Sequence, residues 1–253
     1  KNPLAVTLLG VEFLAHHVPV QDEQVSAVLH DMQEAIQRAD TVIRGLLDFS
    51  RAKSLTTESL SLSAVLEHSL LLVKPLLTRA HIQLAEDLAA DVPTAPLDRT
   101  KVEQVFVNVF MNAIHAMPEG GTLTVRTYSK RLTEPAPRVG TRRSDALRIG
   151  DRVVVAEVDD TGTGIPNDYL RSVFDPFFTT KAVGKGTGLG LTVTKTIVEL
   201  HQGLIDIANR PEGGVRVTIT FPVSRGPVRD PDPMEGGEGH GNGHEQAAHS
   251  HRG

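Results

Sequence analysis

Residues 159–191 read DDTGTGIPNDYLRSVFDPFFTTKAVGKGTGLGL, and this segment is the most informative part of the chain for its fold and function. It holds two glycine clusters, at 160–164 and at 184–190, with three phenylalanines between them. Alternating glycines let backbone N–H groups approach a polyanion, because no Cβ stands in the way. A helical pattern follows the second cluster directly, and a helix N-terminus attracts phosphate. The second cluster therefore predicts a phosphate-binding loop, although a plain glycine loop is the alternative for either cluster alone.

A third segment, residues 104–116, carries two amides four residues apart, Asn108 and Asn112. Residues at this spacing share one face of a helix. The positions around them are almost all apolar, which indicates a helix that is buried nearly all round. Buried amides need partners, and carboxamide oxygens are good ligands for a hard cation that bridges phosphates. In the first glycine cluster, Asp160 is placed to accept a hydrogen bond from the amino group of a base, or simply to cap the turn.

Four motifs follow one another along the chain: N-x-x-x-N-A from Asn108, D-x-G-x-G from Asp160, F-x-P-F-F-T-T-K from Phe174 and G-x-G-x-G-L-G-L from Gly184. In this order they resemble the N, G1, F and G2 boxes of sensor histidine kinases of two-component systems. The resemblance covers roughly residues 1–223. It implies a kinase core that binds ATP with Mg²⁺ and transfers the γ-phosphoryl to a histidine, and thence to an aspartate of a response regulator.

The resemblance also implies roles for individual residues. Asp160 would accept a hydrogen bond from the adenine N6 amino group, while Gly162 and Gly164 would permit close approach. Asn112 would be the Mg²⁺ ligand, and Asn108, one turn earlier, would lie near the metal and its water. The other ATP-site residues that the resemblance implies are His115, Ile165, Thr179, Thr180, Lys181, Gly184, Gly186, Thr187, Gly188, Leu189 and Gly190.

Residues 182–187 would form a glycine-hinged lid over the nucleotide. Phe174, Phe177 and Phe178 would pack at its base, and core packing is their alternative role. His115 stands where many relatives carry a basic phosphate contact. A neutral imidazole donates only one hydrogen bond, so the role of His115 stays open.

Two other functions compete with phosphotransfer. In related ATPases the position of Asn108 is typically a Glu that activates water, and an amide has no basic pKa for this task. This difference, with a heptad pattern near the N-terminus, argues against a GHKL-type ATPase that acts as a nucleotide-driven conformational clamp. A non-catalytic scaffold is disfavoured because Asn112, Asp160 and the second glycine cluster are all present.

Two heptad patterns occupy residues 1–18 and 22–50, separated by Pro19, and predict an antiparallel helical hairpin. The second apolar stripe is wider than a two-helix seam needs. This width favours a homodimeric four-helix bundle through residues 1–50 over a hairpin that packs on the rest of its own chain. By resemblance, this hairpin is the dimerisation and histidine phosphotransfer domain, and it docks the receiver domain of a response regulator.

The N-terminus departs from the family pattern. Residues 1–4, KNPL, fit only the end of the acceptor motif H-E-x-x-N-P-L, so the acceptor histidine is expected before Lys1 and the chain is interpreted as N-terminally truncated. We therefore expect the fragment to bind Mg-ATP without phosphorylating itself. Asn2 matches the position that relatives use to orient water during dephosphorylation. His16, His17 and His30 lack the motif around them and are predicted to face solvent.

The rest of the chain predicts an α+β protein. A polar linker at 51–60 would precede a catalytic domain at 61–223, an α/β sandwich of the GHKL or histidine kinase ATPase type. We expect helices at 62–79, 98–117 and 192–201, covering one face of a mixed sheet, and an exposed loop at 130–151. The predicted strands are 81–88, 122–129, 153–158, 204–208 and 215–221. Residues 224–253, rich in glycine and histidine, predict a disordered tail with solvated histidines rather than a metal site.

Composition narrows the function further. The 253 residues carry a net charge of −5 and no basic run, which gives no reason to expect a nucleic-acid partner. The absence of cysteine fits a reducing compartment. No run of about 18 apolar residues occurs, so we expect no membrane contact from this segment. A cytoplasmic location is the expectation, with any anchor in a sensor region outside the sequence given.

Overall fold

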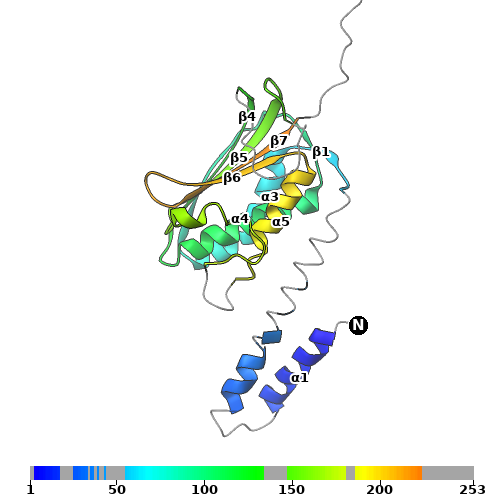
Figure 1. The fold of residues 1–253 in the computed structure, drawn as a ribbon, viewed down its shortest axis with the longest axis vertical. Coiled ribbons are helices and arrows are strands. Elements are labelled where there is room, and N and C mark those ends of the chain that lie inside the picture. The colour runs from blue at the N-terminus through cyan, green and yellow to red at the C-terminus, as the bar shows by residue number, and fades with distance from the viewer. Residues whose placement is uncertain are drawn as a thin grey trace, which may run out of the picture.

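The computed structural model describes residues 3–17, 25–33, 35–36, 39, 43, 55–133, 147–180 and 186–223 (Figure 1). The predicted tail at 224–253, Asn2 and most of the predicted exposed loop lie outside these ranges. None of the helices in the described ranges is long and apolar enough to cross a membrane.

The N-terminal region contains two helical segments that lie side by side (Figure 1). Helix α1 (Pro3–His17) is the first, and the described residues between 25 and 43 are also helical. The two segments are linked by a hydrogen bond of 3.4 Å from Gln33 Nε2 to Glu12 Oε1. Val11 of the predicted stripe is buried, but Val25 and Met32 of the predicted second stripe are exposed. His30 is exposed, as predicted.

The sheet of the main domain has five strands in the order β2-β4-β5-β7-β6. The strands β2 and β4 are parallel, and every other neighbouring pair is antiparallel. This mixed sheet confirms the predicted fold class. The strands are β2 (Ile82–Leu88), β4 (Gly121–Arg131), β5 (Arg152–Asp160), β6 (Leu204–Asn209) and β7 (Val215–Pro222).

Three helices cover one face of this sheet (Figure 1). They are α3 (Leu62–Arg79), α4 (Arg99–Ala116) and α5 (Gly190–Leu200), and α4 packs against both of the others. Side-chain caps set two of their starts: Ser61 Oγ accepts from the backbone N–H of Ala64, and Asp98 Oδ1 from that of Lys101. Phe106 and Phe110 of α4 are fully buried in the core between helices and sheet.

The central strand β5 alternates strictly between the two faces of the sheet. Val154, Ala156 and Val158 belong to the core beneath the helices. Because side chains alternate along a strand, Asp160 projects to the helix face and Asp159 to the outer face. The end of β5 therefore separates two adjacent carboxylates onto opposite sides of the sheet.

Two short strands were missing from the sequence prediction. The strands β1 (Glu58–Leu60) and β3 (Ala95–Leu97) form a separate antiparallel pair. The strand β1 thus occupies the last three positions of the segment predicted as a linker, because three paired residues are too few to leave a periodic pattern. In addition, α5 begins at Gly190, two residues before the predicted start.

Candidate functional site

Asp160 ends β5 and is nearly buried, with 6% of its surface exposed. Its Oδ1 accepts from the backbone N–H groups of Gly162 (2.8 Å) and Val215 (3.2 Å). Among the described residues, no hydrogen bond ends on its Oδ2. Burial raises the pKa of Asp160, although both hydrogen bonds and the charge of Arg210 oppose that shift. The carboxylate is thus held by one oxygen and leaves the other as an acceptor.

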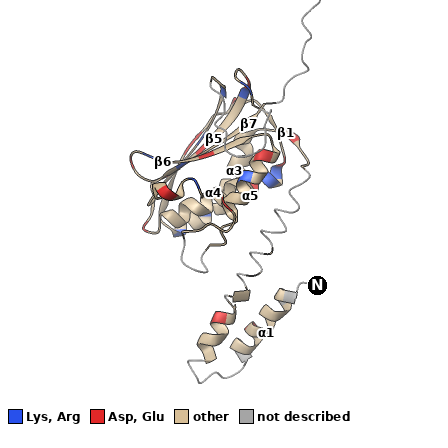
Figure 2. Ribbon diagram, in the orientation of Figure 1, with Lys and Arg blue, Asp and Glu red and all other residues tan. Residues whose placement is uncertain are grey.

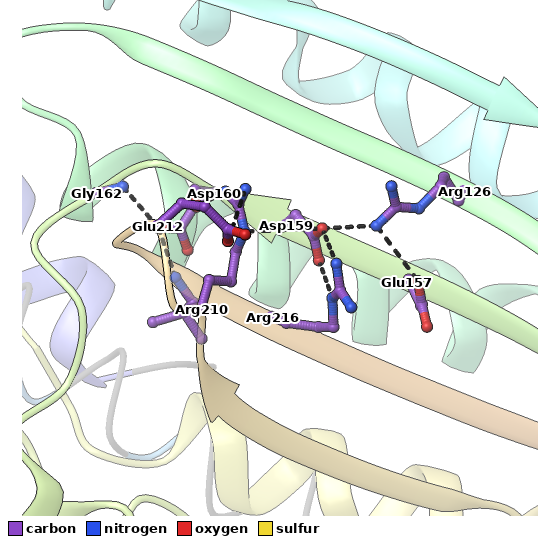
Figure 3. Close-up of polar contacts among 9 residues, drawn as sticks. Arg126, Glu157, Asp159, Asp160, Gly162, Arg210, Glu212 and Arg216 are labelled. Carbon is purple, nitrogen blue, oxygen red and sulfur yellow. Dashed lines mark hydrogen bonds and ion pairs between the residues drawn. The ribbon is translucent and has the colours of Figure 1, made fainter.

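Asp159, the preceding residue, is committed to a cluster of arginines on the outer face (Figure 3). Arg216 contacts it through two nitrogens, at 2.7 Å and 2.6 Å, and Arg126 Nη2 lies 2.7 Å from Oδ2. Arg210 Nε lies 3.9 Å from the same oxygen. Burial would raise the pKa of Asp159, but the hydrogen bond and charge of Arg216, with the other arginines, hold it below its usual value. Asp159 is a structural ion-pair partner, which agrees with Asp160 being the stronger candidate.

The glycine turn after Asp160 packs on the C-terminus of α4. A Cβ at Gly162 would lie 2.6 Å from the carbonyl oxygen of Ala116 and 2.8 Å from its Cβ, so no side chain fits there. The backbone N–H of Thr163 donates to the same carbonyl at 3.2 Å. The predicted reason for a glycine at position 162 is close approach of a ligand. In the structure it is α4 that approaches this glycine closely. At Gly164 the φ angle of +74° is in the region that favours glycine.

The amide helix α4 contacts the start of α5. Asn108 Nδ2 lies 3.3 Å from the carbonyl oxygen of Gly190 and 3.4 Å from Thr194 Oγ1. Donation to these two acceptors leaves the Asn108 oxygen as an acceptor. Asn112 lies one turn further along α4 and is half-buried. The structure therefore brings Asn108 and the last glycine of the second cluster, Gly190, together.

The second glycine cluster leads straight into α5. Among the described residues, no side chain caps the start of this helix, and Leu189 N–H lies 3.3 Å from Thr187 Oγ1. Gly188, with a φ of +65°, packs against the backbone of Phe177 so closely that a Cβ would collide with it. Phe177 N–H donates to the Gly188 carbonyl at 3.0 Å. The described part of the cluster is thus fixed to the phenylalanine segment before it.

The three phenylalanines do not all pack as expected. Phe174 packs partly on the core, and Phe178 meets Tyr169 edge to face at 5.5 Å. Phe177, by contrast, is 58% exposed and has a φ of +66°. Core packing, the alternative role, is therefore wrong for Phe177, while most of the predicted lid lies outside the described residues.

The other predicted site residues differ in exposure, and some of them lie outside the described residues. His115, Thr179 and Thr180 are exposed, while Leu189 is buried. Gly186 and Thr187 are half-buried. Lys181, Gly184 and residues 182–185 of the predicted lid lie outside the described residues.

Sequence reasoning missed the residues that hold the glycine turn from the β6–β7 side. Asn209 Oδ1 accepts from Ile165 N–H at 2.8 Å, and Asn209 Nδ2 donates to the Ile165 carbonyl at 2.6 Å. Arg210 Nη1 donates to the Asp160 carbonyl at 2.7 Å. The only local signal is the Gly213–Gly214 pair, which marks a tight turn but not what that turn touches.

Comparison with known proteins places this architecture. The family of histidine kinase-, DNA gyrase B-, and HSP90-like ATPases matches residues 97–225. The sensor kinase CckA of Brucella abortus (strain 2308) is 37% identical over 221 residues, which are 87% of this chain and 23% of CckA. The signal transduction histidine-protein kinase AtoS of Escherichia coli (strain K12) is 30% identical over 226 residues, which are 88% of this chain and 33% of AtoS. The chain therefore spans a minor part of the length of these relatives.

Solved structures show the same fold. The nucleotide-free catalytic domain of the histidine kinase ThkA is 25% identical, with a TM-score of 0.53, over 66% of this chain and 96% of that one. Full-length ShkA in complex with AMPPNP is 20% identical, with a TM-score of 0.60, over 88% of this chain and 45% of that one. At these identities the likeness concerns the architecture of sheet and helices.

Proposed function

The chain belongs to the family of histidine kinase-, DNA gyrase B-, and HSP90-like ATPases, and we propose that it is the kinase core of a two-component sensor histidine kinase. It binds ATP with Mg²⁺ and transfers the γ-phosphoryl to a histidine, from which the group passes to an aspartate of a response regulator. Its curated relatives are sensor kinases, which supports this assignment over a conformational-clamp ATPase.

The arrangement of Asp160 is the observation that carries the proposal. Oδ1 is fixed by two backbone N–H groups, and Oδ2 accepts no hydrogen bond among the described residues. A fixed carboxylate oxygen suits the N6 amino group of adenine. At the same position guanine carries a carbonyl, which would repel the carboxylate. Asp160 therefore selects adenine, with the glycine turn up to Ile165 beside it.

The phosphate groups belong at the start of α5. Its first N–H groups receive no side-chain cap from the part of the chain that the structure describes and follow a glycine cluster, so they can donate to an anion at the positive end of the helix dipole. Gly186, Gly188 and Gly190 supply the backbone there, with Lys181 and Thr187 beside them. The proposed ATP site also includes three exposed residues, His115, Thr179 and Thr180.

Two amides fit a magnesium ion that arrives with the nucleotide. Mg²⁺ keeps several waters and phosphate oxygens and needs only one or two protein ligands, so the carboxamide oxygen of Asn112, with that of Asn108 nearby, suffices. When bound, the ion would neutralise charge on the triphosphate. Asn108 lacks a basic group, so it positions rather than activates a water, and the γ-phosphoryl is kept for an imidazole nucleophile.

The N-terminal helices fit a homodimer through residues 1–50. Most of the described residues in these helical segments are neither acidic nor basic (Figure 2). Large apolar side chains are exposed on both helical segments: Val6, Leu9, Phe13, Leu14, Val25, Val28, Met32 and Ile43. A single chain leaves this apolar surface in water, and a second copy would cover it. The bundle so formed is also the proposed docking site for the receiver domain.

Competition binding tests the nucleotide assignment. A fluorescent ATP analogue with Mg²⁺ should bind the chain, and ATP should displace it far better than GTP. Asp160→Asn and Asn112→Asp should each weaken ATP binding by about tenfold or more, since the first removes the charged acceptor for the base and the second places an extra negative charge beside the triphosphate. Asp206→Asn, an exposed carboxylate on β6, is the matched control and should bind like the parent. Equal affinity of all four proteins for ATP would overturn the proposal.

Autophosphorylation is a separate question. The complete acceptor motif is not present in these 253 residues, so we propose that the chain binds ATP without labelling itself. Incubation with γ-labelled ATP should leave no acid-labile, base-stable phosphate on the protein. Such a phosphate would show that another histidine of the chain serves as acceptor.

A further inference from the structure

The turn between β6 and β7 is built to meet the end of β5. Residues 210–214 close on themselves, since Arg210 N–H donates to the Gly214 carbonyl at 3.0 Å and Gly213 N–H to the Arg210 carbonyl at 3.1 Å. Gly213 and Gly214 both have positive φ angles, +98° and +82°, that other residues rarely adopt. The turn therefore has one defined shape, and its contacts are reproducible.

Three of those contacts converge on Asp160. Arg210 Nη1 donates to its main-chain carbonyl at 2.7 Å, and Val215 N–H donates to its Oδ1 at 3.2 Å. The α-carbon of Gly214 lies so close to the same carbonyl that any Cβ would collide with it. The backbone and the side chain of Asp160 are thus held by this turn and by the first residue of β7; Figure 3 shows Arg210 beside Asp160.

Arg210 is itself held from the outer face of the sheet. Its Nε lies 3.9 Å from Asp159 Oδ2, and its Nη2 lies 3.8 Å from Glu212. Arg216 already makes the two short contacts with Asp159, so Arg210 is left with an Nε that is buried and lacks a hydrogen-bond partner. An unpartnered buried donor costs free energy. Despite this cost, the Arg210 side chain stays in a position from which its Nη1 donates to the Asp160 carbonyl.

We propose that Arg210 is a positioning residue for adenine recognition: through the 2.7 Å contact of its Nη1, it fixes the Asp160 carbonyl and thereby sets the direction of the free carboxylate oxygen. This inference rests on the proposed function, because it assumes that Asp160 binds the N6 amino group. Arg210 does not touch the nucleotide in this scheme. Its effect is confined to the one hydrogen bond that Asp160 makes with the base.

The test compares two nucleotides, ATP and purine riboside 5′-triphosphate, which lacks the N6 amino group. Arg210→Met should lower the ratio of the two affinities by about fivefold, by weakening ATP binding alone. Arg126→Met is the matched control, because Arg126 contacts Asp159 at 2.7 Å and has no contact with Asp160 among the described residues. It should keep the parent ratio. Thermal unfolding of each variant checks that the fold is retained.

Each outcome decides the matter. An unchanged ratio in Arg210→Met, an equal loss of affinity for both nucleotides, or the same fall in Arg126→Met would overturn the positioning role. If Arg210→Met does not fold, Arg210→Lys carries the test, since one ammonium cannot reach both Asp159 and the Asp160 carbonyl in the geometry of a guanidinium. Asp160→Asn separates the two proposals. If this variant keeps the parent ratio of the two affinities, the adenine assignment fails. If the ratio falls in Asp160→Asn but not in Arg210→Met, only the positioning role of Arg210 is refuted.

Discussion

At the scale of single residues, Asp159 and Asp160 are neighbours, yet their pKa values shift in opposite directions. Both are nearly buried, with 3% and 6% of their surfaces exposed. Asp159 faces three arginines, so its charge is compensated. Asp160 receives two backbone hydrogen bonds on one oxygen and keeps the other without a partner among the described residues. A buried charge without full compensation is the usual mark of a residue kept for binding.

The first prediction concerns the cost of that charge. Because burial raises the pKa of Asp160, the folded protein binds a proton there more tightly than the unfolded chain, and ionisation at pH 7 opposes folding. Asp160→Asn keeps the Oδ1 acceptor and removes the charge, so it should raise the free energy of unfolding by about 1 kcal/mol while it weakens ATP binding. The gain should vanish as the pH falls through the raised pKa. Urea unfolding between pH 7 and pH 4 measures it, and a less stable variant at pH 7 would contradict it.

Asp159 carries the opposite prediction. Its folded pKa is lowered, so its ionised form stabilises the protein above the ordinary carboxylate pKa, and that stability is lost as the pH falls through the folded value. Asp159→Asn leaves three arginines without their shared partner and should lower the free energy of unfolding at pH 7 by about 3 kcal/mol. The deficit should shrink in acid. Glu212→Gln, an exposed member of the same cluster, should stay within about 0.5 kcal/mol of the parent, and an equal effect of the two would refute the argument.

At the scale of elements, the sequence predicts a helix correctly where the apolar periodicity and the cap both lie within one segment. The bounds predicted for α3 match the structure, and Asp98 caps α4 as expected, because apolar periodicity and caps are written in consecutive residues. The order of the four motifs likewise points to Asp160 and the amide helix as candidates for the site. The arginines around Asp159 escaped prediction because they come from β4, β7 and the β6–β7 turn. They meet only through the register of a sheet, which a single sequence does not display.

A buried histidine joins two of the helices and gives the third prediction. His201 Nε2 accepts from the backbone N–H of Asp98, at 2.9 Å, and its Nδ1 lies 2.8 Å from the Ile197 carbonyl, so the end of α5 is tied to the start of α4. Burial lowers the pKa of His201 from the usual 6.5, although Ile197 and the charge of Asp98 oppose the shift. The folded protein therefore favours neutral imidazole, and its stability should fall as the pH drops below about 6.5.

The measurement is a stability profile between pH 8 and pH 5 for the parent and for His201→Asn. The variant loses the link between the helices and should be less stable at pH 8 by about 2 kcal/mol. Its profile should also be flatter, since the group that titrates is gone. A parent slope that survives in His201→Asn would assign the acid sensitivity to another group.

At the scale of the whole molecule, the main domain and the N-terminal helices differ in how fully they bury their apolar residues. The main domain buries its apolar residues between one sheet face and three helices. In α1, Leu4 and Leu8 are half-buried and Val11 is buried, whereas Val6, Leu9 and Phe13 form a second apolar line that is exposed. Val25, Val28 and Met32 repeat that spacing on the next helical segment. Exposed apolar lines on both helices at helical spacing are what a helix bundle with a second copy would bury.

The last prediction tests that second copy. Leu9 and Phe13 are 67% and 59% exposed and lie one turn apart on α1, so Leu9→Gln with Phe13→Gln removes exposed apolar surface from this line. Burial of each such side chain contributes about 1.5–3 kcal/mol, so the double variant should raise the dimer Kd by about a hundredfold or more. Light-scattering mass across a dilution series measures this. Leu72→Gln changes an equally apolar, 55% exposed residue on α3 and should leave the dimer intact. ATP affinity, measured alongside, should be the same in all three proteins, because all residues of the proposed nucleotide site lie in the main domain. A parent that stays monomeric at every concentration would show that the exposed lines on these helices are covered by something other than a second copy.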